Sequence, residues 1–197
     1  MTREQLLRRA GHLGSPVKEA LEADSTVVES VPTPFFSRAA IYRISTRPPL
    51  RPKLYYVGLA NHETTLLLNQ QPENFFKLAA EGALNLAPEP HRVLYAVTFL
   101  ESTVDYSGDL QILNKIEEAW WLPKMRPEEE QAKEAIVAKY RNVVHEPRLA
   151  PGSSATVVAF VIRRRELRRV ELKLETSGRI QVQETVLEPE VPVVYIR

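Results

Sequence analysis

Strand-like segments occupy two parts of the chain, and they limit the folds that this sequence can adopt. Each segment is rich in β-branched, aromatic and leucine residues, the composition typical of strands. The first group lies at 26–31, 38–45, 54–59 and 64–68, and the second at 156–162, 169–174, 179–186 and 192–196. The stretch LANHETT joins the third and fourth segments as in a hairpin. We therefore expect mainly antiparallel pairing.

The N-terminus is typical of two short helices. Thr2 and Gln5 have the spacing of a capping box, in which each side chain bonds a free amide of the first turn. Ser15 offers a second N-cap, with Pro16 at the favoured first helical position. We expect a helix, a break, and a second helix ending near Ala23.

The middle of the chain mixes both kinds of element. A helix is predicted from Pro72 to about Leu84, and the almost continuous apolar run at 93–100 predicts a central strand. A helical period of apolar residues predicts a helix from Asp109, with Trp120 buried and Trp121 at its margin. The longest helix is expected from Pro127, where three glutamates suit the helix dipole.

A hairpin is predicted where the strands at 169–174 and 179–186 meet. A three-residue loop, Thr176-Ser177-Gly178, places Leu174 opposite Ile180. Gly178 then takes the left-handed conformation that such a loop requires at its last position.

These patterns predict an α+β protein. We expect an antiparallel-leaning mixed sheet with about four helices packed mainly on one face. With 197 residues, 44% of them hydrophobic, the chain is long enough for one packed core. We expect a single domain over 1–197, with an N-terminal helical segment at 1–24 and the sheet and remaining helices at 25–197.

Composition excludes several classes of protein. The absence of cysteine rules out disulfides, thiol nucleophiles and cysteine-bound zinc. The first residues lack the apolar core of a secretory signal, and no apolar run approaches the roughly 20 residues needed to span a bilayer. We expect a soluble cytoplasmic protein without a membrane segment.

No local motif for catalysis, cofactor binding or metal binding is present. The seven glycines lie too far apart for a phosphate loop or a dinucleotide fingerprint. His62 and Glu63 begin like a zinc-protease helix, but Leu66 stands where the second histidine is needed. Asp105 and Asp109 could form an acid pair, but the sequence between them favours a turn. We predict no catalytic residues, no metal and no cofactor.

Two basic stretches keep a different function open. Residues 163–169 hold five arginines. Residues 30–62 contain no acid but hold Arg38, Arg43, Arg47, Arg51 and Lys53. Aromatic residues among the second group would suit single-stranded nucleic acid. The net charge is only +1, and glutamates accompany the arginines, so nucleic-acid binding is not expected.

We expect a non-catalytic binding or accessory protein that recognises a protein partner or a small ligand. The alternatives are a nucleic-acid or polyanion binder through Arg38–Lys53 and Arg163–Arg169, and a hydrolase or lyase with dispersed acid–base residues. A homodimer through the apolar C-terminal segment VPVVYI is a further alternative. The candidate ligand-binding residues are Arg43, Tyr55, Trp121, Arg163 and Arg165.

Overall fold

The chain forms two compact units, each with its own antiparallel sheet. The computed structural model describes residues 2–47, 53–61 and 64–194. Unit 1 comprises Met1–Gly108 with Thr176–Arg179, and unit 2 comprises Asp109–Glu175 with Ile180–Arg197. The α+β class and the antiparallel pairing are confirmed, although the strands form two sheets rather than one. The single domain over 1–197 stays a prediction, because a compact unit need not be an independently folding domain.

Unit 1 is built on a four-stranded meander. Its strands, in the spatial order β1-β2-β3-β4, are β1 (Val27–Val31), β2 (Ala39–Ser45), β3 (Leu54–Ala60) and β4 (Thr64–Leu67). Each strand pairs antiparallel with the next along the chain. All four strands predicted between residues 26 and 68 are therefore confirmed to within about two residues.

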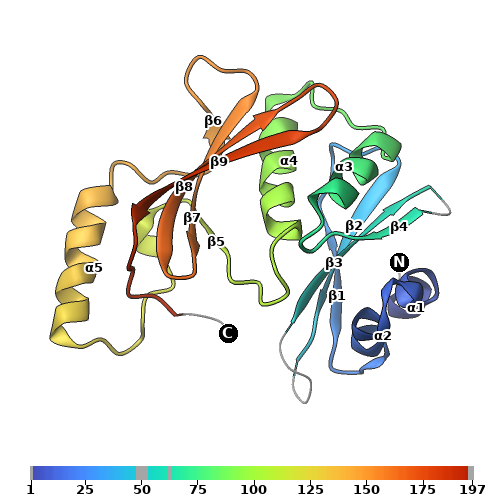
Figure 1. The fold of residues 1–197 in the computed structure, drawn as a ribbon, viewed down its shortest axis with the longest axis horizontal. Coiled ribbons are helices and arrows are strands. Elements are labelled where there is room, and N and C mark those ends of the chain that lie inside the picture. The colour runs from blue at the N-terminus through green and yellow to red at the C-terminus, as the bar shows by residue number, and fades with distance from the viewer. Residues whose placement is uncertain (1, 48–52, 62–63, 195–197) are drawn as a thin grey trace. The chain divides into compact units, whose positions relative to one another are not determined.

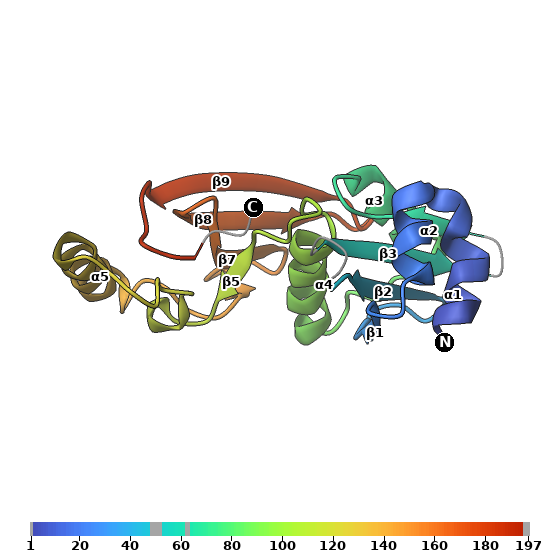
Figure 2. The ribbon, with the colours of Figure 1, turned by 90° about the horizontal axis from the view of Figure 1, so that it is seen from below.

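Two N-terminal helices cover one face of this sheet (Figure 1). Helix α1 (Arg3–Ala10) begins with the predicted Thr2–Gln5 capping box, and α2 (Ser15–Glu22) follows the single turn η1 (Gly11–Leu13). The N-cap of α2 is Gly14 rather than the predicted Ser15, which lies one position inside the helix. Figure 2 shows α1 and α2 side by side. Their buried side chains pack on the β2 and β3 residues Ile44, Tyr55, Val57 and Leu59.

The other face of the sheet meets helix α3 (Pro72–Glu81), with Leu78 against Gly58 of β3. A Cβ on Gly58 would lie 2.6 Å from Leu78 Cδ2, so a larger residue here would force the buried Leu78 side chain to shift. Phe75 of α3 is fully buried and lies edge-on to Phe99 of the following helix, with ring centroids 5.3 Å apart. Strand β3 is therefore buried on both faces.

The predicted central strand at 93–100 is wrong, because this segment belongs to helix α4 (Glu89–Ser102). Its buried residues are Tyr95, Ala96, Thr98, Phe99 and Ser102, which follow a helical period. Pro90 occupies the first turn, where its missing N–H costs nothing. A buried helix and a buried strand look alike in a short apolar run, and here the polar Thr98 and Ser102 continue the helical face.

Unit 2 holds a five-stranded sheet and helix α5 (Pro127–Tyr140). Strands β5 (Gln111–Leu113), β7 (Thr156–Arg163), β8 (Glu166–Leu174) and β9 (Ile180–Glu188) lie in that order, and β6 (Arg148–Leu149) also pairs with β7. Ile136 and Tyr140 of α5 join a core that includes Phe160 and Ile162 of β7. The helix predicted from Pro127 is confirmed.

The helix predicted from Asp109 is wrong. The segment instead forms β5 and the single turn η2 (Ile116–Glu118), and Leu113 pairs with Phe160 of β7. The Gln111 side chain donates to the Glu118 carbonyl at 2.7 Å and accepts from the Trp120 amide at 2.9 Å. Pairing with β7 therefore overrides a helical pattern, because Leu113 and Ile116 are fully buried without a helix.

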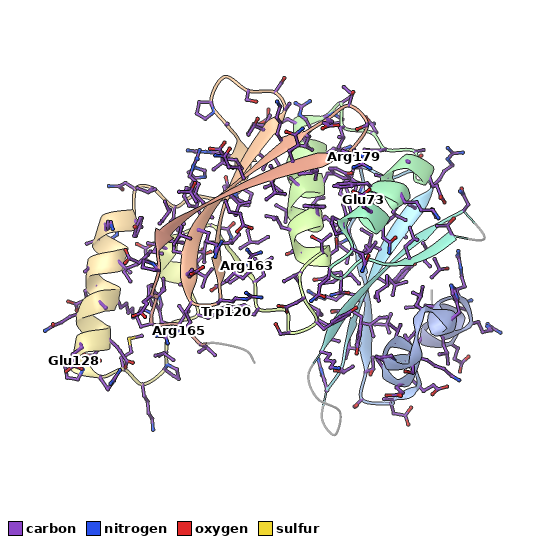
Figure 3. The ribbon with its side chains drawn as sticks, viewed as in Figure 1. Glu73, Trp120, Glu128, Arg163, Arg165 and Arg179 are labelled. Carbon is purple, nitrogen blue, oxygen red and sulfur yellow. The ribbon has the colours of Figure 1, made fainter. Side chains whose placement is uncertain are left out.

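The hairpin between β8 and β9 has the predicted register. Leu174 lies opposite Ile180 and Leu172 opposite Val182, and Gly178 has a φ of +85°. The tip, Thr176–Arg179, belongs to unit 1. There the buried Tyr95 hydroxyl donates to the Gly178 carbonyl at 2.5 Å, and Arg179 forms an ion pair with Glu73 at 2.8 Å (Figure 3). Local turn chemistry was sufficient to predict this hairpin.

The predicted C-terminal strand at 192–196 is not formed by its described residues. Val193 makes a single antiparallel bridge to Trp121, and the Val194 amide donates to the Trp120 carbonyl at 2.8 Å. Tyr195 and Ile196 lie outside the described residues. None of the helices in the described ranges combines the length and the hydropathy that crossing a bilayer requires.

We predict that Gly178→Ala lowers the free energy of unfolding by about 2 kcal/mol. The substitution adds the strain of positive φ, and its Cβ would lie 2.7 Å from Leu84 Cδ2 and 3.2 Å from the Tyr95 hydroxyl. Gly152→Ala is the matched control, since Gly152 also has positive φ, +74°, but its Cβ would meet nothing within 4 Å. We expect the control to cost only about 1 kcal/mol in urea unfolding. Equal costs would contradict the packing described for the tip.

Candidate functional site

Unit 1 contains a pocket of about 180 Å³ beside the start of β3. Four parts of the chain form it: the junction of η1 and α2, the start of β3, the end of β4, and the segment after α4. Its lining residues are Leu13, Pro16, Val17, Lys53, Tyr55, Leu67 and Tyr106. Most of this lining is aliphatic or aromatic, so the pocket favours an apolar occupant.

Two tyrosine rings form the aromatic wall of the pocket. The centroids of Tyr55 and Tyr106 are 5.3 Å apart, with the ring planes inclined by 52°. Burial is the main cause that raises the pKa of the Tyr55 phenol, and the nearby Tyr106 adds to it. The Tyr55 hydroxyl therefore stays protonated at neutral pH and can donate a hydrogen bond to a ligand.

A buried asparagine holds this wall in place. Asn69 is fully buried, and its amide nitrogen donates to the carbonyls of Leu54 at 3.0 Å and Val104 at 3.2 Å. Its side-chain oxygen accepts from the Tyr56 amide at 2.7 Å. The Leu54 amide in turn donates to the Tyr106 carbonyl at 2.9 Å. These bonds tie the segment carrying Tyr106 to β3, which carries Tyr55.

Lys53 supplies the positive charge of the pocket lining. Its backbone is fixed by Thr46, whose hydroxyl accepts from the Lys53 amide at 2.7 Å and whose amide donates to the Lys53 carbonyl at 3.0 Å. The residue is exposed, and its ammonium has no ion pair within the described residues. A negatively charged group on a ligand could therefore pair with it at the mouth of the pocket.

A second polar group lies on the opposite face of the sheet. The strand register places Glu29, Arg43 and Tyr56 side by side on β1, β2 and β3. Arg43 Nη2 bonds Glu29 Oε2 at 2.8 Å, which raises the pKa of the guanidinium. Glu101 of α4 completes the group, and burial raises the pKa of its carboxyl although Arg43 opposes this. Burial also raises the pKa of Tyr56 to about 12, with a contribution from Glu101.

Three of the five arginines at 163–169 are paired with glutamates. Arg163 and Arg168 both bond Glu184 Oε2, each at 2.7 Å. Arg168 also contacts Glu166, and Arg169 contacts Glu171. Burial alone would lower the pKa of Arg168, but the bonds to these glutamates raise it. Most of this stretch is therefore neutralised locally rather than free to bind phosphates.

The link between β7 and β8 is shorter than the gap between the strands predicted at 156–162 and 169–174. It consists only of Arg164 and Arg165, which have φ values of 53° and 65°. The Arg164 amide donates to Asp109 Oδ2 at 3.0 Å, which helps to hold this left-handed turn. Figure 3 shows Arg163 and Arg165 near this end of the hairpin. Asp109 is thus a structural partner of the turn.

The two tryptophans have the reverse of the predicted exposure. Trp120 is 47% exposed, whereas Trp121 is half-buried against the core of unit 2. The Trp121 indole N–H donates to the Glu117 carbonyl at 3.3 Å, and the Lys133 ammonium lies 5.6 Å from its ring. The prediction was wrong because it assumed a helix, whereas the chain leaves η2 in an extended conformation.

The structure does not bring the five candidate residues together in one site. Tyr55 lines the pocket, and Arg43 lies on the opposite face of the same sheet. Trp121, Arg163 and Arg165 belong to unit 2. The other pocket residues were missed because they come from separate segments without a shared motif. Among them, Lys53 belongs to the first basic stretch, Pro16 to the start of the second predicted helix and Tyr106 to the predicted turn at 105–109, but nothing in the sequence indicated that they meet.

Two other acid–base side chains, Asp105 and His91, make hydrogen bonds to nearby backbone groups. Asp105 Oδ1 accepts from the Ser107 amide at 2.9 Å, which confirms the turn expected there. Nδ1 of His91 lies 3.0 Å from the Asn85 carbonyl, and His62 lies outside the described residues. Across the described ranges, no three His, Asp or Glu side chains gather in a way that could hold a metal ion.

Comparison of the chain with known protein families, with curated proteins and with solved structures gave no match. The function is therefore argued from the pocket and the surfaces themselves.

We predict that Glu101→Gln increases stability at neutral pH. A raised folded pKa means that the native state holds the Glu101 proton more tightly than the unfolded chain. Its stabilising contribution is complete below the unfolded pKa of about 4.3 and is lost as pH rises through the folded pKa. The free energy of unfolding of the wild type should therefore fall relative to the variant over this window. Urea unfolding at several pH values measures the difference.

The matched control is Glu134→Gln, on an exposed position of α5. Its difference from the wild type should not follow the pH profile of Glu101→Gln. If the free energies of unfolding of the wild type and Glu101→Gln differ by the same amount at every pH, Glu101 is not desolvated as described.

Proposed function

We propose that this protein is a non-catalytic, cytoplasmic binding protein whose unit 1 pocket holds a small apolar ligand with a negatively charged end group. The observation that carries the proposal is the lining of the pocket. Two tyrosine rings and four aliphatic side chains surround its interior, and Lys53 is the one cationic member of the lining. A single-ring or short-chain carboxylate has the matching chemistry.

The size of the pocket limits the ligand. Drug-sized molecules occupy sites of about 300–1,000 Å³, whereas an apolar cavity of about 150 Å³ is enough for a benzene ring. The pocket, at about 180 Å³, lies near the lower value. It is therefore suited to one ring or a chain of a few carbons, with the charged group directed to solvent and Lys53.

The chemistry of the lining supports binding over hydrolysis or elimination. General acid–base catalysis usually needs a histidine or carboxyl group near the reacting atoms, and the lining residues include neither. The raised pKa of Tyr55 keeps its phenol protonated, so it does not act as a base at neutral pH. What remains is an apolar site with hydrogen-bond donors and one cation, which favours the binding function.

We predict that ligand-observed NMR on the full chain detects binding of benzoate and of its neutral analogue toluene. Leu67→Trp should abolish both signals, because the larger side chain fills the pocket from β4. Lys53→Met should lower the affinity for benzoate by about fivefold or less, because an exposed ion pair contributes up to about 1 kcal/mol. The affinity for toluene should not change.

Val143→Trp is the matched control, because Val143 is 43% exposed in unit 2 and lies outside the pocket lining. It should bind both compounds as the wild type does. Circular dichroism of each variant verifies the fold. Binding that survives in Leu67→Trp, or no binding to the wild type, would refute the proposed site.

The nucleic-acid alternative finds little support in the side-chain pairing. Arg43, Arg163, Arg168 and Arg169 all contact glutamates. Of the aromatic residues in the first basic stretch, Tyr42 is half-buried against the core of unit 1, and the others are buried: Phe35, Phe36, Tyr55 and Tyr56. Phosphate binding gains affinity through uncompensated cations, and base stacking needs exposed rings.

We predict at most weak binding of single-stranded DNA or RNA, lost at near-physiological salt. Fluorescence anisotropy would compare the wild type with a variant in which Arg163, Arg164, Arg165 and Arg168 are all serine. Sub-micromolar binding that resists salt in the wild type and disappears in the variant would favour the polyanion alternative.

A further inference from the structure

Strand β9 forms an open edge of the unit 2 sheet. It is the last strand in the order and pairs with β8, and the described residues contain no strand on its other side. Five residues in the middle of β9 are exposed: Gln181, Val182, Gln183, Thr185 and Val186. Such an edge can accept another strand through its backbone N–H and C=O groups.

The ladder shows which backbone groups point outward. The Leu174 amide donates to the Ala155 carbonyl at 2.7 Å, so Leu174 directs its backbone groups toward β7. These groups alternate along a strand, and Leu174 lies opposite Ile180. The even-numbered residues of β9, from Ile180 to Val186, therefore direct their N–H and C=O groups to the open edge. Val182, Glu184 and Val186 are the central three.

The side chains of these three residues make the edge attractive to a strand. Val182 and Val186 are 43% and 44% exposed, and they lie on the same side of the strand as Glu184. Protected edges commonly carry lysine, proline or a very short strand. Strand β9 has nine residues and contains neither lysine nor proline.

The charge at the centre of the edge is already neutralised. Glu184 Oε2 accepts from Arg163 and Arg168, each at 2.7 Å, and Arg168 also contacts Glu166. This network holds two guanidiniums and two carboxylates. A second Glu184 can therefore approach the first with much less repulsion than two free carboxylates would meet.

We propose that β9 pairs antiparallel with β9 of a second copy of this chain, with the two-fold axis at Glu184. In this register Val182 of each copy lies opposite Val186 of the other, and Glu184 lies opposite its equivalent. Outward backbone groups meet outward groups at all three positions, which gives about six hydrogen bonds. An isologous interface of this kind closes as a dimer.

The neighbouring registers fit less well. Centring the pair on Gln183 or on Thr185 places a valine opposite Glu184, which leaves apolar surface against a charged network. Only the register centred on Glu184 makes two valine pairs, the kind of cross-strand contact that stabilises a sheet.

This surface differs from the C-terminal segment that the sequence indicated. Val193 and Val194 are engaged with Trp121 and Trp120 of the same chain. The β9 proposal also does not depend on the ligand pocket, which is lined by unit 1 residues. One strand from each copy is a small interface, so we expect a weak, concentration-dependent dimer.

Sedimentation of the full chain over a range of concentrations tests the dimer. The wild type should associate, and the double variants Val182→Lys/Val186→Lys and Val182→Glu/Val186→Glu should each associate at least about tenfold more weakly, a loss of about 1.4 kcal/mol. Like charges would face each other in each of these homodimers. A mixture of the two variants should restore association, because every Lys then lies opposite a Glu.

The control is Val143→Lys, at a similarly exposed valine outside β9, and its association should match that of the wild type. A wild type that stays monomeric throughout would overturn the proposal. So would a dimer that the lysine and glutamate variants leave unchanged.

Cysteine cross-linking tests the register directly, since the chain has no cysteine of its own. Position 183 of one copy should lie opposite position 185 of the other, at a separation that a disulfide can bridge. A mixture of Gln183→Cys and Thr185→Cys chains should therefore cross-link between the two variants. Gln183→Cys alone should cross-link much less, because its two equivalents are offset along the strands. Equal cross-linking in both samples would overturn the register.

Discussion

The burial of β3 on both faces organises unit 1. Every residue from Tyr55 to Ala60 is buried, with the N-terminal helices over Tyr55, Val57 and Leu59 and α3 against Gly58. Alternation along the strand then separates two environments that adjoin in sequence. Tyr55 turns toward the apolar pocket, whereas Tyr56 turns toward Arg43 and Glu101. Neither environment could move to the other face without a change of register that would expose the core of the sheet.

The two units place their charges differently. In unit 2 arginines and glutamates form contacts along and across strands, so much of the charge of a stretch that looks strongly basic in the sequence is neutralised in the structure. In unit 1 the charges are fewer, and Lys53 stands beside an apolar pocket without a glutamate partner within the described residues. A single cation beside an apolar surface is a more specific feature for recognition than arginines that are matched by acids, as three of the five at 163–169 are. Local pairing therefore says more about binding than the density of charge in the sequence.

Features determined by neighbouring residues could be predicted from the sequence, and features determined by distant packing could not. The Thr2–Gln5 cap and the β8–β9 register depend on a few adjacent residues, and both are confirmed. The run at 93–100 is apolar enough for a strand or a helix, and packing within unit 1 stabilises it as helix α4. The segment after Asp109 has a helical pattern, but pairing with β7 made it a strand. The pocket combines residues from Leu13 to Tyr106, and no spacing in the sequence indicates that they meet.

The tip of the β8–β9 hairpin shows that the boundary between the units is not a single point in the chain. Thr176–Arg179 contributes to the packing of unit 1, whereas the strands on either side belong to unit 2. A fragment ending at Gly108 would therefore lack a piece of its own interior. The Tyr95 hydroxyl would lose its hydrogen-bond acceptor. The side chains of Ala79 and Leu84 would lose their packing against the backbone at Gly178. Expression of either unit by itself would thus require either a redesigned surface at this point or the missing tetrapeptide supplied in trans.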